Sequence, residues 1–253
     1  MPDPDRSPGD RRDRLVFVGD VHLERDDPDL PEFLEFLDRL GRTSCRIVLI
    51  GDLFDLWIGR RELEQSHHAA VASKLAGLRR QGVRVYYLEG NRDYRIGGGQ
   101  TGRAFDASTE AGRVEEFAGR RIYAIHGDLV NPEDRQYRLW RRISRSGLAW
   151  AIFNALPRAT RLRWSSGAES RMRESNLAFK LEFPEQAVRD YAAGLFRQGC
   201  DAVVLGHFHV EKDLHAHPPG PPGRILVLPE WKGSRRHLEV SADGQIGFVD
   251  SMG

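Results

Sequence analysis

Residues 83–95 read VRVYYLEGNRDYR, an apolar run followed by the dipeptide Gly90-Asn91. The run has the composition of a buried strand, and the glycine permits a sharp exit from it. The amide oxygen of Asn91 is then placed to ligate a cation. Four more apolar runs carry aspartate or histidine at or near their ends: LVFVGDVH (15–22), RIVLIGDLF (46–54), RRIYAIHGD (120–128) and DAVVLGHFH (201–209).

Helical spacing separates these runs, so strands and helices alternate along the chain. The segments with that spacing are 31–42, 62–82 and 185–199, and a closing hairpin is predicted at 237–250 around Asp243-Gly244. Strands that alternate with helices favour parallel βαβ units, and the late hairpin adds antiparallel strands. The sequence therefore predicts an α/β fold with two mixed sheets.

Composition narrows the class of protein. The chain has 253 residues, 40% of them hydrophobic, a net charge of +1 and two distant cysteines. This balance excludes a nucleic-acid coat and a disulfide framework, and it favours a reducing, cytoplasmic setting. No stretch approaches the roughly 20 apolar residues that a membrane span requires. Residues 1–13 are expected to form a disordered tail and 14–253 the folded domain.

Residues 129–184 depart from the alternation and are expected to form a basic helical insertion. Eleven basic residues between Arg135 and Lys180 face only two acidic ones, Glu169 and Glu174. Aromatic residues are interleaved with them, among them Trp140, Trp150 and Phe153. Such an insertion could wall an acyl-chain cleft or rest on the anionic inner leaflet of a membrane. A nucleic-acid groove, which is less favoured, and a plain helical subdomain stay open.

Every strand-like run ends in residues that ligate hard metal ions, and the carboxyl ends of parallel strands meet at one edge of a sheet. The candidates are Asp20, His22, Asp52, Asp55, Asn91, His126, Asp128, His207 and His209. Carboxylate, imidazole and amide ligands without thiolate favour Mn²⁺, Fe²⁺ or Zn²⁺, with Mg²⁺ as a further option. The set is too large for one ion, and two ions about 3.5–4 Å apart would suit in-line phosphoryl displacement. The five other histidines lack this context and are expected to be exposed or in loops: His67, His68, His215, His217 and His237.

The ordered motifs GDVH, GDLFD, GNRD, HGD and GHFH resemble the calcineurin-like metallophosphoesterase superfamily. The resemblance implies a four-layer α/β/β/α sandwich with a dinuclear centre bridged by Asp52. One ion would be held by Asp20, His22, Asp52 and His209. The other would be held by Asp52, Asn91, His126 and His207.

Arg92 stands where the superfamily more commonly has a histidine that protonates an alkoxide leaving group. Arginine cannot supply that proton, because its pKa exceeds about 12, but it can hold a phosphoryl group by two hydrogen bonds. A phosphate leaving group needs no such proton, since its second pKa is about 6. GNRD therefore favours pyrophosphate over ester cleavage, with Asp52, Asn91, Arg92 and His126 at the catalytic centre.

With the basic insertion, these motifs resemble the UDP-2,3-diacylglucosamine pyrophosphatases of lipid A biosynthesis. The resemblance implies a lid over the acyl chains and cleavage of the substrate to UMP and 2,3-diacylglucosamine 1-phosphate. It implies substrate contacts by Asn91, Arg92, Asp134, Tyr137, Asn176, Lys180 and His207. A phosphoesterase of another substrate and a non-catalytic scaffold are the alternatives, and the sequence leaves the oligomeric state open.

Overall fold

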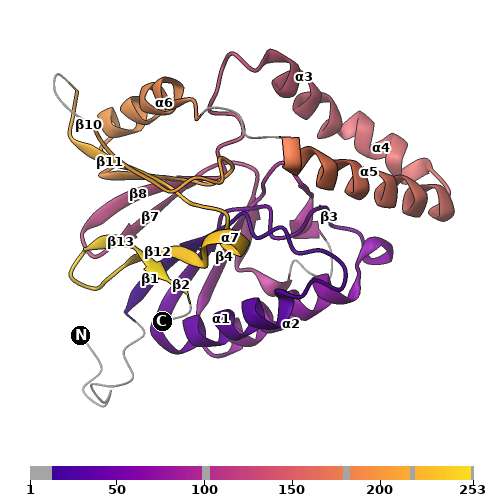
Figure 1. The fold of residues 1–253 in the computed structure, drawn as a ribbon, viewed down its shortest axis with the longest axis horizontal. Helices are drawn as coiled ribbons and strands as arrows, with labels where there is room; N and C mark the ends of the chain where they lie inside the picture. The colour runs from indigo at the N-terminus through magenta and orange to yellow at the C-terminus, as the bar shows by residue number, and fades with distance from the viewer. Residues whose placement is uncertain (1–12, 99–102, 179–182, 217–219, 252–253) are drawn as a thin grey trace.

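The fold is seen in a computed structural model that describes residues 13–98, 103–178, 183–216 and 220–251, with the backbone alone for 169–178 (Figure 1). The predicted tail, apart from residue 13, lies outside the described residues. Two mixed sheets form the centre of the molecule, as the sequence predicts.

The first sheet has the order β13-β12-β1-β2-β4-β6. Its strands are β1 (Arg14–Val18), β2 (Ser44–Leu49), β4 (Arg84–Leu88), β6 (Ala107–Thr109), β12 (Arg236–Val240) and β13 (Ile246–Asp250). Strands β1, β2, β4 and β6 run parallel, while the predicted C-terminal hairpin, β12 and β13, is antiparallel. Gly244 closes that hairpin at a φ of 81°, a value that glycine adopts without strain.

The second sheet has the order β10-β11-β9-β8-β7. Its strands are β7 (Arg113–Phe117), β8 (Arg120–Ile125), β9 (Ala202–Leu205), β10 (Lys212–Ala216) and β11 (Gly223–Val227). Strands β8, β9 and β11 are parallel, and antiparallel strands form both edges. All five predicted ligand-bearing runs therefore begin as parallel strands of one sheet or the other.

Apolar side chains from the two sheets pack face to face. Phe17 and Val48 of the first sheet share one buried cluster with Ala124, Val204 and Leu226 of the second. Helices α1 (Leu30–Thr43) and α2 (Ser66–Arg80) cover the outer face of the first sheet, and α6 (Glu185–Arg197) covers that of the second. The four-layer α/β/β/α architecture is thereby confirmed.

The amphipathic pattern of α1 explains its packing. Phe33, Phe36, Leu37 and Leu40 recur at helical spacing and are all buried against the first sheet and Trp231. Pro31 in the first turn presets the helical φ where no hydrogen-bond donor is needed. Truncation of Phe36 to alanine is expected to cost about 3–5 kcal/mol of stability, because a cavity would remain beside Trp231.

Helix α2 begins later than its predicted start at residue 62. A 3₁₀ turn, η1 (Arg61–Leu63), comes first, and Gln65 and His68 then form a reciprocal cap. The expectation that His67 and His68 are exposed or in a loop is wrong, since each is 2% exposed in α2 beside Phe54. The apolar periodicity of α2 is weak, so the spacing of its residues does not indicate which face is buried.

His237 is also buried, at 3% exposure in β12, where its ring nitrogens lie 2.9 Å from Ser251 Oγ and Glu239 Oε1. Its expected exposure is therefore wrong too, because its ring packs against Phe36 of α1, with 5.0 Å between the ring centres. His215 is exposed in β10, as predicted, and His217 lies outside the described residues.

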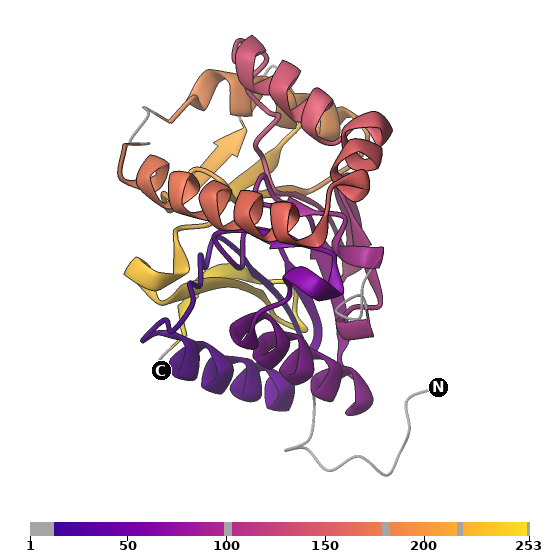
Figure 2. The ribbon, with the colours of Figure 1, turned by 90° about the vertical axis from the view of Figure 1, so that its right-hand side faces the viewer.

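The insertion is helical, as predicted, and lies beyond the ends of the two sheets (Figures 1 and 2). It comprises α3 (Arg135–Ser144), α4 (Gly147–Ala155) and α5 (Arg158–Ala178). It rests on a two-stranded sheet of β3 (Trp57–Ile58) and β5 (Asp93–Tyr94), followed by η2 (Ile96–Gly98). A short helix, α7 (Trp231–Ser234), precedes β12, and the described residues contain no helix long and apolar enough to cross a membrane.

Candidate metal centre

The loops that follow β1, β2 and β9 carry an unusual backbone. Asp20, His22, Asp52, His207 and His209 all have positive φ, between 49° and 72°. Residues other than glycine rarely adopt this left-handed region, and backbone strain of this kind clusters at functional sites. The tight turns direct these polar side chains toward one another. The strained backbone costs some folding stability, which the site tolerates in order to hold the polar groups together.

Asp20, His22 and His209 form one group of potential ligands. The two Nε2 atoms of the imidazoles lie 3.1 Å apart, and Asp20 Oδ1 lies 3.9 Å from His22 Nε2 and 3.5 Å from His209 Nε2. Asp20 Oδ1 is buried without a hydrogen-bond partner, although it lies beside both imidazoles. Buried polar atoms that converge without partners are costly unless a cation satisfies them. This group fits a metal ion.

Asn91, His126 and His207 meet in a second group. Asn91 Oδ1 lies 2.9 Å from His126 Nε2 and 3.0 Å from His207 Nδ1. The Nδ1 atom of His126 lies 2.9 Å from the carbonyl oxygen of Ile50, to which it can donate. A backbone carbonyl that accepts a hydrogen bond from Nδ1–H leaves Nε2 as the free ligand atom, an arrangement typical of metal-binding histidine.

Asp20 and Asp52 connect the two groups. Ligand atoms of Asp20, Asp52 and His126 lie within 4.8 Å of one another, as do those of Asp20, His22 and His209. Asp20 is thus common to both sets of three, whereas the resemblance gives the bridging role to Asp52. Nitrogen and oxygen donors without sulfur suit divalent metal ions such as Mn²⁺, Zn²⁺ or Fe²⁺.

The electrostatics prepare the site for cations. Burial lowers the pKa of His22 well below its ordinary value and that of His207 to about 4, so both imidazoles are neutral. Burial alone would raise the pKa of Asp20, but His209, His126 and His22 outweigh it and lower the pKa. Burial alone would lower the pKa of His126 and of His209. The neighbouring carboxylates outweigh this effect, so the pKa of each of these histidines is raised. The raised pKa values show that the carboxylates favour positive charge at these two rings, either as a bound proton or as a metal ion.

Arg92 lies at the same centre, buried to 5% exposure. Its backbone N–H donates to Asp52 Oδ1 at 3.0 Å, and its Nε lies 3.6 Å from Asp52 Oδ2. Its Nη1 lies 3.7 Å from Asp55 Oδ1. The guanidinium is therefore held beside the ligand groups by two carboxylates, where it can meet an anionic substrate.

Comparison with known proteins identifies the family. The pattern of the calcineurin-like phosphoesterases matches residues 13–211. The chain belongs to this family.

Individual relatives match most of the chain. It is 30% identical over 237 residues to the UDP-2,3-diacylglucosamine hydrolase of Pseudomonas paraeruginosa, covering 91% of this chain and 96% of the relative. The protein of that name from Aeromonas salmonicida is 31% identical over 218 residues, 85% of each chain. Among solved structures, a Thermotoga maritima protein covers 94% of this chain and 97% of its own, with 14% identity and a TM-score of 0.46, too remote to carry an argument.

The phosphoesterase fold joins its insertion to this centre through Asp128. The Tyr137 hydroxyl donates to Asp128 Oδ2, and Arg141 Nε lies 3.0 Å from the same oxygen. The carboxylate of Asp134 caps α3 by accepting the backbone N–H of Tyr137 at 3.0 Å. Asp134 and Tyr137, predicted to meet the substrate, thus also hold α3 in place, and their contact with substrate stays a prediction.

Two residues of this phosphoesterase were missed by the sequence reasoning. Asp93 is fully buried and accepts the backbone N–H groups of Asp52 and Gly90 and the hydroxyl of Tyr87. Arg145, at the end of α3, reaches the same turn from outside. Asp93 belongs to the quoted GNRD motif and could have been suspected, but nothing local to Arg145 indicated its contacts.

The three predicted lid aromatics divide between two faces. Trp140 is 46% exposed, whereas Trp150 and Phe153 pack on the apolar cluster of Leu56, Ile58 and Leu63. Trp140 belongs to α3. Within α4, the sequence could not tell the packed Trp150 and Phe153 from the exposed Leu148 and Ile152, because this helix is apolar almost all round. The side chain of Asn176 and the whole of Lys180 lie outside the described residues.

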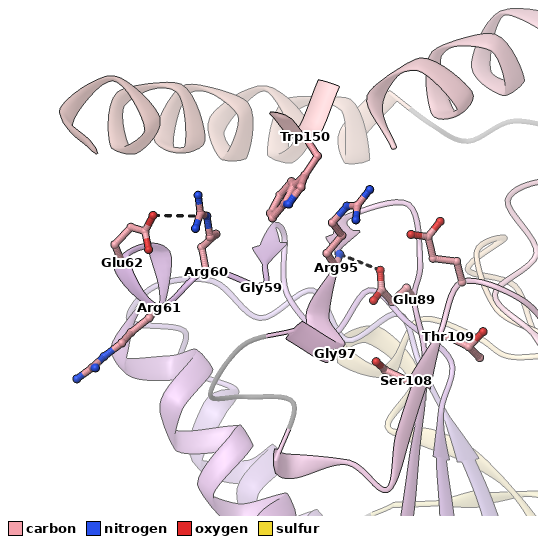
Figure 3. Close-up of a pocket in the computed structure, with 11 residues that line it drawn as sticks. Gly59, Arg60, Arg61, Glu62, Glu89, Arg95, Gly97, Ser108, Thr109 and Trp150 are labelled. Atoms are coloured by element: carbon pink, nitrogen blue, oxygen red, sulfur yellow. Dashed lines mark hydrogen bonds and ion pairs between the residues drawn. The ribbon is translucent and has the colours of Figure 1, made fainter. Parts of the chain in front are cut away.

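Trp150 also lines a cavity of about 780 Å³ between α4 and the first sheet (Figure 3). The guanidinium carbons of Arg60 and Arg95 lie 5.6 Å and 5.2 Å from the Trp150 ring centre. Glu62, Glu89 and Glu110 also line this cavity. The lining of this cavity is charged, so it does not suit an acyl chain. The apolar cluster on which Trp150 and Phe153 pack has the composition that an acyl chain would require.

Proposed function

We propose that this chain hydrolyses the diphosphate of UDP-2,3-diacylglucosamine to UMP and 2,3-diacylglucosamine 1-phosphate, a step of lipid A biosynthesis. The single observation that carries the proposal is the buried Arg92 beside two converging groups of metal-ligand side chains. The family membership and relatives named for this substrate, matched over 85–91% of the chain, support it. Residues 14–253 form the phosphoesterase domain of this proposal, with the insertion at 129–184.

In this proposal the centre holds two divalent ions, Mn²⁺ first among them. Asp20, His22, Asp52 and His209 would hold one ion, and Asp52, Asn91, His126 and His207 the other. Bound metal ions supply Lewis acidity and lower the pKa of water for attack on phosphorus. The chain's own residues position the ligands: the carbonyl oxygen of Ile50 can accept a hydrogen bond from Nδ1–H of His126, and Asp20 accepts the backbone N–H of His207 at 2.8 Å.

Arg92 provides the specificity for a phosphoanhydride. Its guanidinium can donate two hydrogen bonds to a phosphoryl group, and its low exposure keeps water from screening them. A departing nucleotide phosphate is stable as an anion and requires no proton donor, so the absence of a general acid at this position is no handicap. An alkoxide leaving group would require one.

The insertion supplies the lipid end of the site. Substrate contacts are proposed for Asn91, Arg92 and His207 at the centre and for Asp134, Tyr137, Asn176 and Lys180 from the insertion. Trp140 is one of the large exposed apolar residues of α3–α5; the others are Leu139, Ile143, Leu148, Ile152, Leu162 and Trp164. The same helices carry many arginines, and we propose that these exposed residues rest on the anionic cytoplasmic leaflet of the inner membrane.

The test is release of UMP from UDP-2,3-diacylglucosamine in detergent micelles by the purified protein loaded with Mn²⁺. We expect turnover by the natural chain and none by Asp52→Ala, which serves as the matched inactive control. Turnover of a simple phosphodiester or of nucleic acid, with no release of UMP, would reject the proposed substrate in favour of another phosphoesterase activity. Metal analysis of the same samples separates an inactive scaffold that binds no ions from an enzyme of different specificity.

A further inference from the structure

Arg145 joins the helical insertion to the turn that carries Asn91 and Arg92. It is the residue that ends α3, directly before Ser146 caps α4, and its side chain is only 8% exposed. A long cationic side chain buried at a junction between helices requires partners for all its donors. Those partners show what the residue does.

The guanidinium spans the Gly90–Asp93 turn. Its Nη2 donates to the carbonyl oxygens of both Gly90 and Asp93, the first and last residues of the turn. Its Nη1 lies 3.3 Å from Glu89 Oε2 and 3.3 Å from Glu110 Oε1, and its central carbon lies 5.1 Å from the ring centre of Tyr94. Every contact but the one to Glu110 falls on the segment from Glu89 to Tyr94.

The same turn is closed from the inside by Asp93, whose carboxylate accepts the N–H of Gly90 at 2.8 Å and that of Asp52 at 3.0 Å. Asn91 and Arg92 lie between the contacts made by Asp93 and those made by Arg145. There, Asn91 Oδ1 lies within hydrogen-bond distance of His126, and the backbone N–H of Arg92 donates to Asp52. Asp93 fastens the turn to the sheet, whereas Arg145 fastens it to the insertion. Loss of either would free the backbone on one side.

We propose that Arg145 is a positioning residue, which sets the orientation of Asn91 and Arg92 and so couples the place of the insertion to the metal centre. Glu89 takes part in this coupling, since it also accepts the N–H groups of Arg95 at 3.0 Å and Ile96 at 2.9 Å. A shift of the α3–α4 junction therefore moves the turn. The coupling rests on the proposed function only for its effect on turnover, since its effect on metal binding is separate.

The experiment compares Arg145→Ala and Arg145→Lys with Arg142→Ala, an exposed arginine of the same helix. Mn²⁺ affinity is measured by titration calorimetry and turnover by UMP release. Partners that orient metal ligands usually change affinity or activity 10–100-fold, so we expect Arg145→Ala to weaken Mn²⁺ binding by about tenfold or more. Arg145→Lys, which cannot span both carbonyls, should be intermediate, and Arg142→Ala should match the natural chain.

Added guanidinium ion, at concentrations that leave the fold intact, should restore part of the Mn²⁺ affinity of Arg145→Ala and none in Asn91→Ala. A purely structural role would lower the melting temperature of Arg145→Ala and leave Mn²⁺ affinity and kcat unchanged in the folded fraction, and that result overturns the proposal. If no variant releases UMP, the proposed substrate fails, while the calorimetry still decides the coupling.

Discussion

Replacement of Arg92 gives the sharpest test of how this centre treats its substrate. The guanidinium lies 3.6 Å and 3.7 Å from the carboxylates of Asp52 and Asp55 and is 5% exposed. A charge-assisted hydrogen bond contributes about 1.5–3 kcal/mol, so loss of two such bonds to a phosphoryl group costs about 3 kcal/mol or more. At about 1.4 kcal/mol per factor of ten, Arg92→Ala should lower kcat/KM about 100-fold or more.

Two further variants divide that effect into its parts. Arg92→Lys keeps the charge but not the two-point geometry, and it should recover about one factor of ten. Arg92→His introduces a proton donor, which a pyrophosphate does not need and an alkyl phosphodiester does. It should therefore stay impaired in UMP release while any activity on a phosphodiester rises.

Metal content by elemental analysis is the control for these variants. It should remain that of the natural chain, because Arg92 carries no ligand atom. Loss of metal from Arg92→Ala, or full UMP release by Arg92→His, would refute the role assigned to the arginine.

Three other perturbations follow from separate parts of the structure. Asp52→Ala should abolish turnover and lower the bound Mn²⁺ measured by calorimetry, because its carboxylate lies among the ligand atoms of the centre. The pair Leu148→Ser and Ile152→Ser, at residues 72% and 57% exposed, should weaken sedimentation with anionic vesicles about tenfold or more, since each aliphatic side chain contributes about 1.5–3 kcal/mol when buried. Burial lowers the pKa of His67 to about 4 and that of His68 to about 3, so the unfolded chain takes up these protons first and stability is lost as the pH falls below about 6.5. For His68 the loss from pH 7 to about pH 5 is about 2 kcal/mol, measurable by urea unfolding of the metal-free protein.

Each of these expectations has a contrary outcome. Full activity of Asp52→Ala would exclude that carboxylate from the centre, and unchanged vesicle binding would show that the exposed apolar residues of α3–α5 do not contact the membrane. For the histidine, His68→Gln keeps an N3 side chain able to cap α2 and should flatten the pH dependence. An equally steep dependence in that variant would trace the acid sensitivity to other groups.

Much of the fold could be predicted because its signals are local. Each ligand-bearing run shows its strand in a few consecutive residues, and α1 shows its buried stripe through Phe33, Phe36 and Leu40. The start of α2 was misplaced because its cap involves Gln65 and His68, which is not a common capping pair. Helices α3 to α5 were expected, but not which way their aromatic side chains face.

The sequence by itself determined the inventory of the centre: a side chain able to ligate a metal ion near the end of each of five strands, and at position 92 an arginine, which cannot donate a proton. Tertiary structure alone decided which of these groups meet and that Asp20 belongs to both sets of three ligand residues. It also decided that Arg145 donates a hydrogen bond to the carbonyl oxygen of Asp93, 52 residues away along the chain. Local patterns arise from backbone periodicity, which a short window reveals. Contacts between distant segments depend instead on how layers pack, and packing is decided by the whole chain at once.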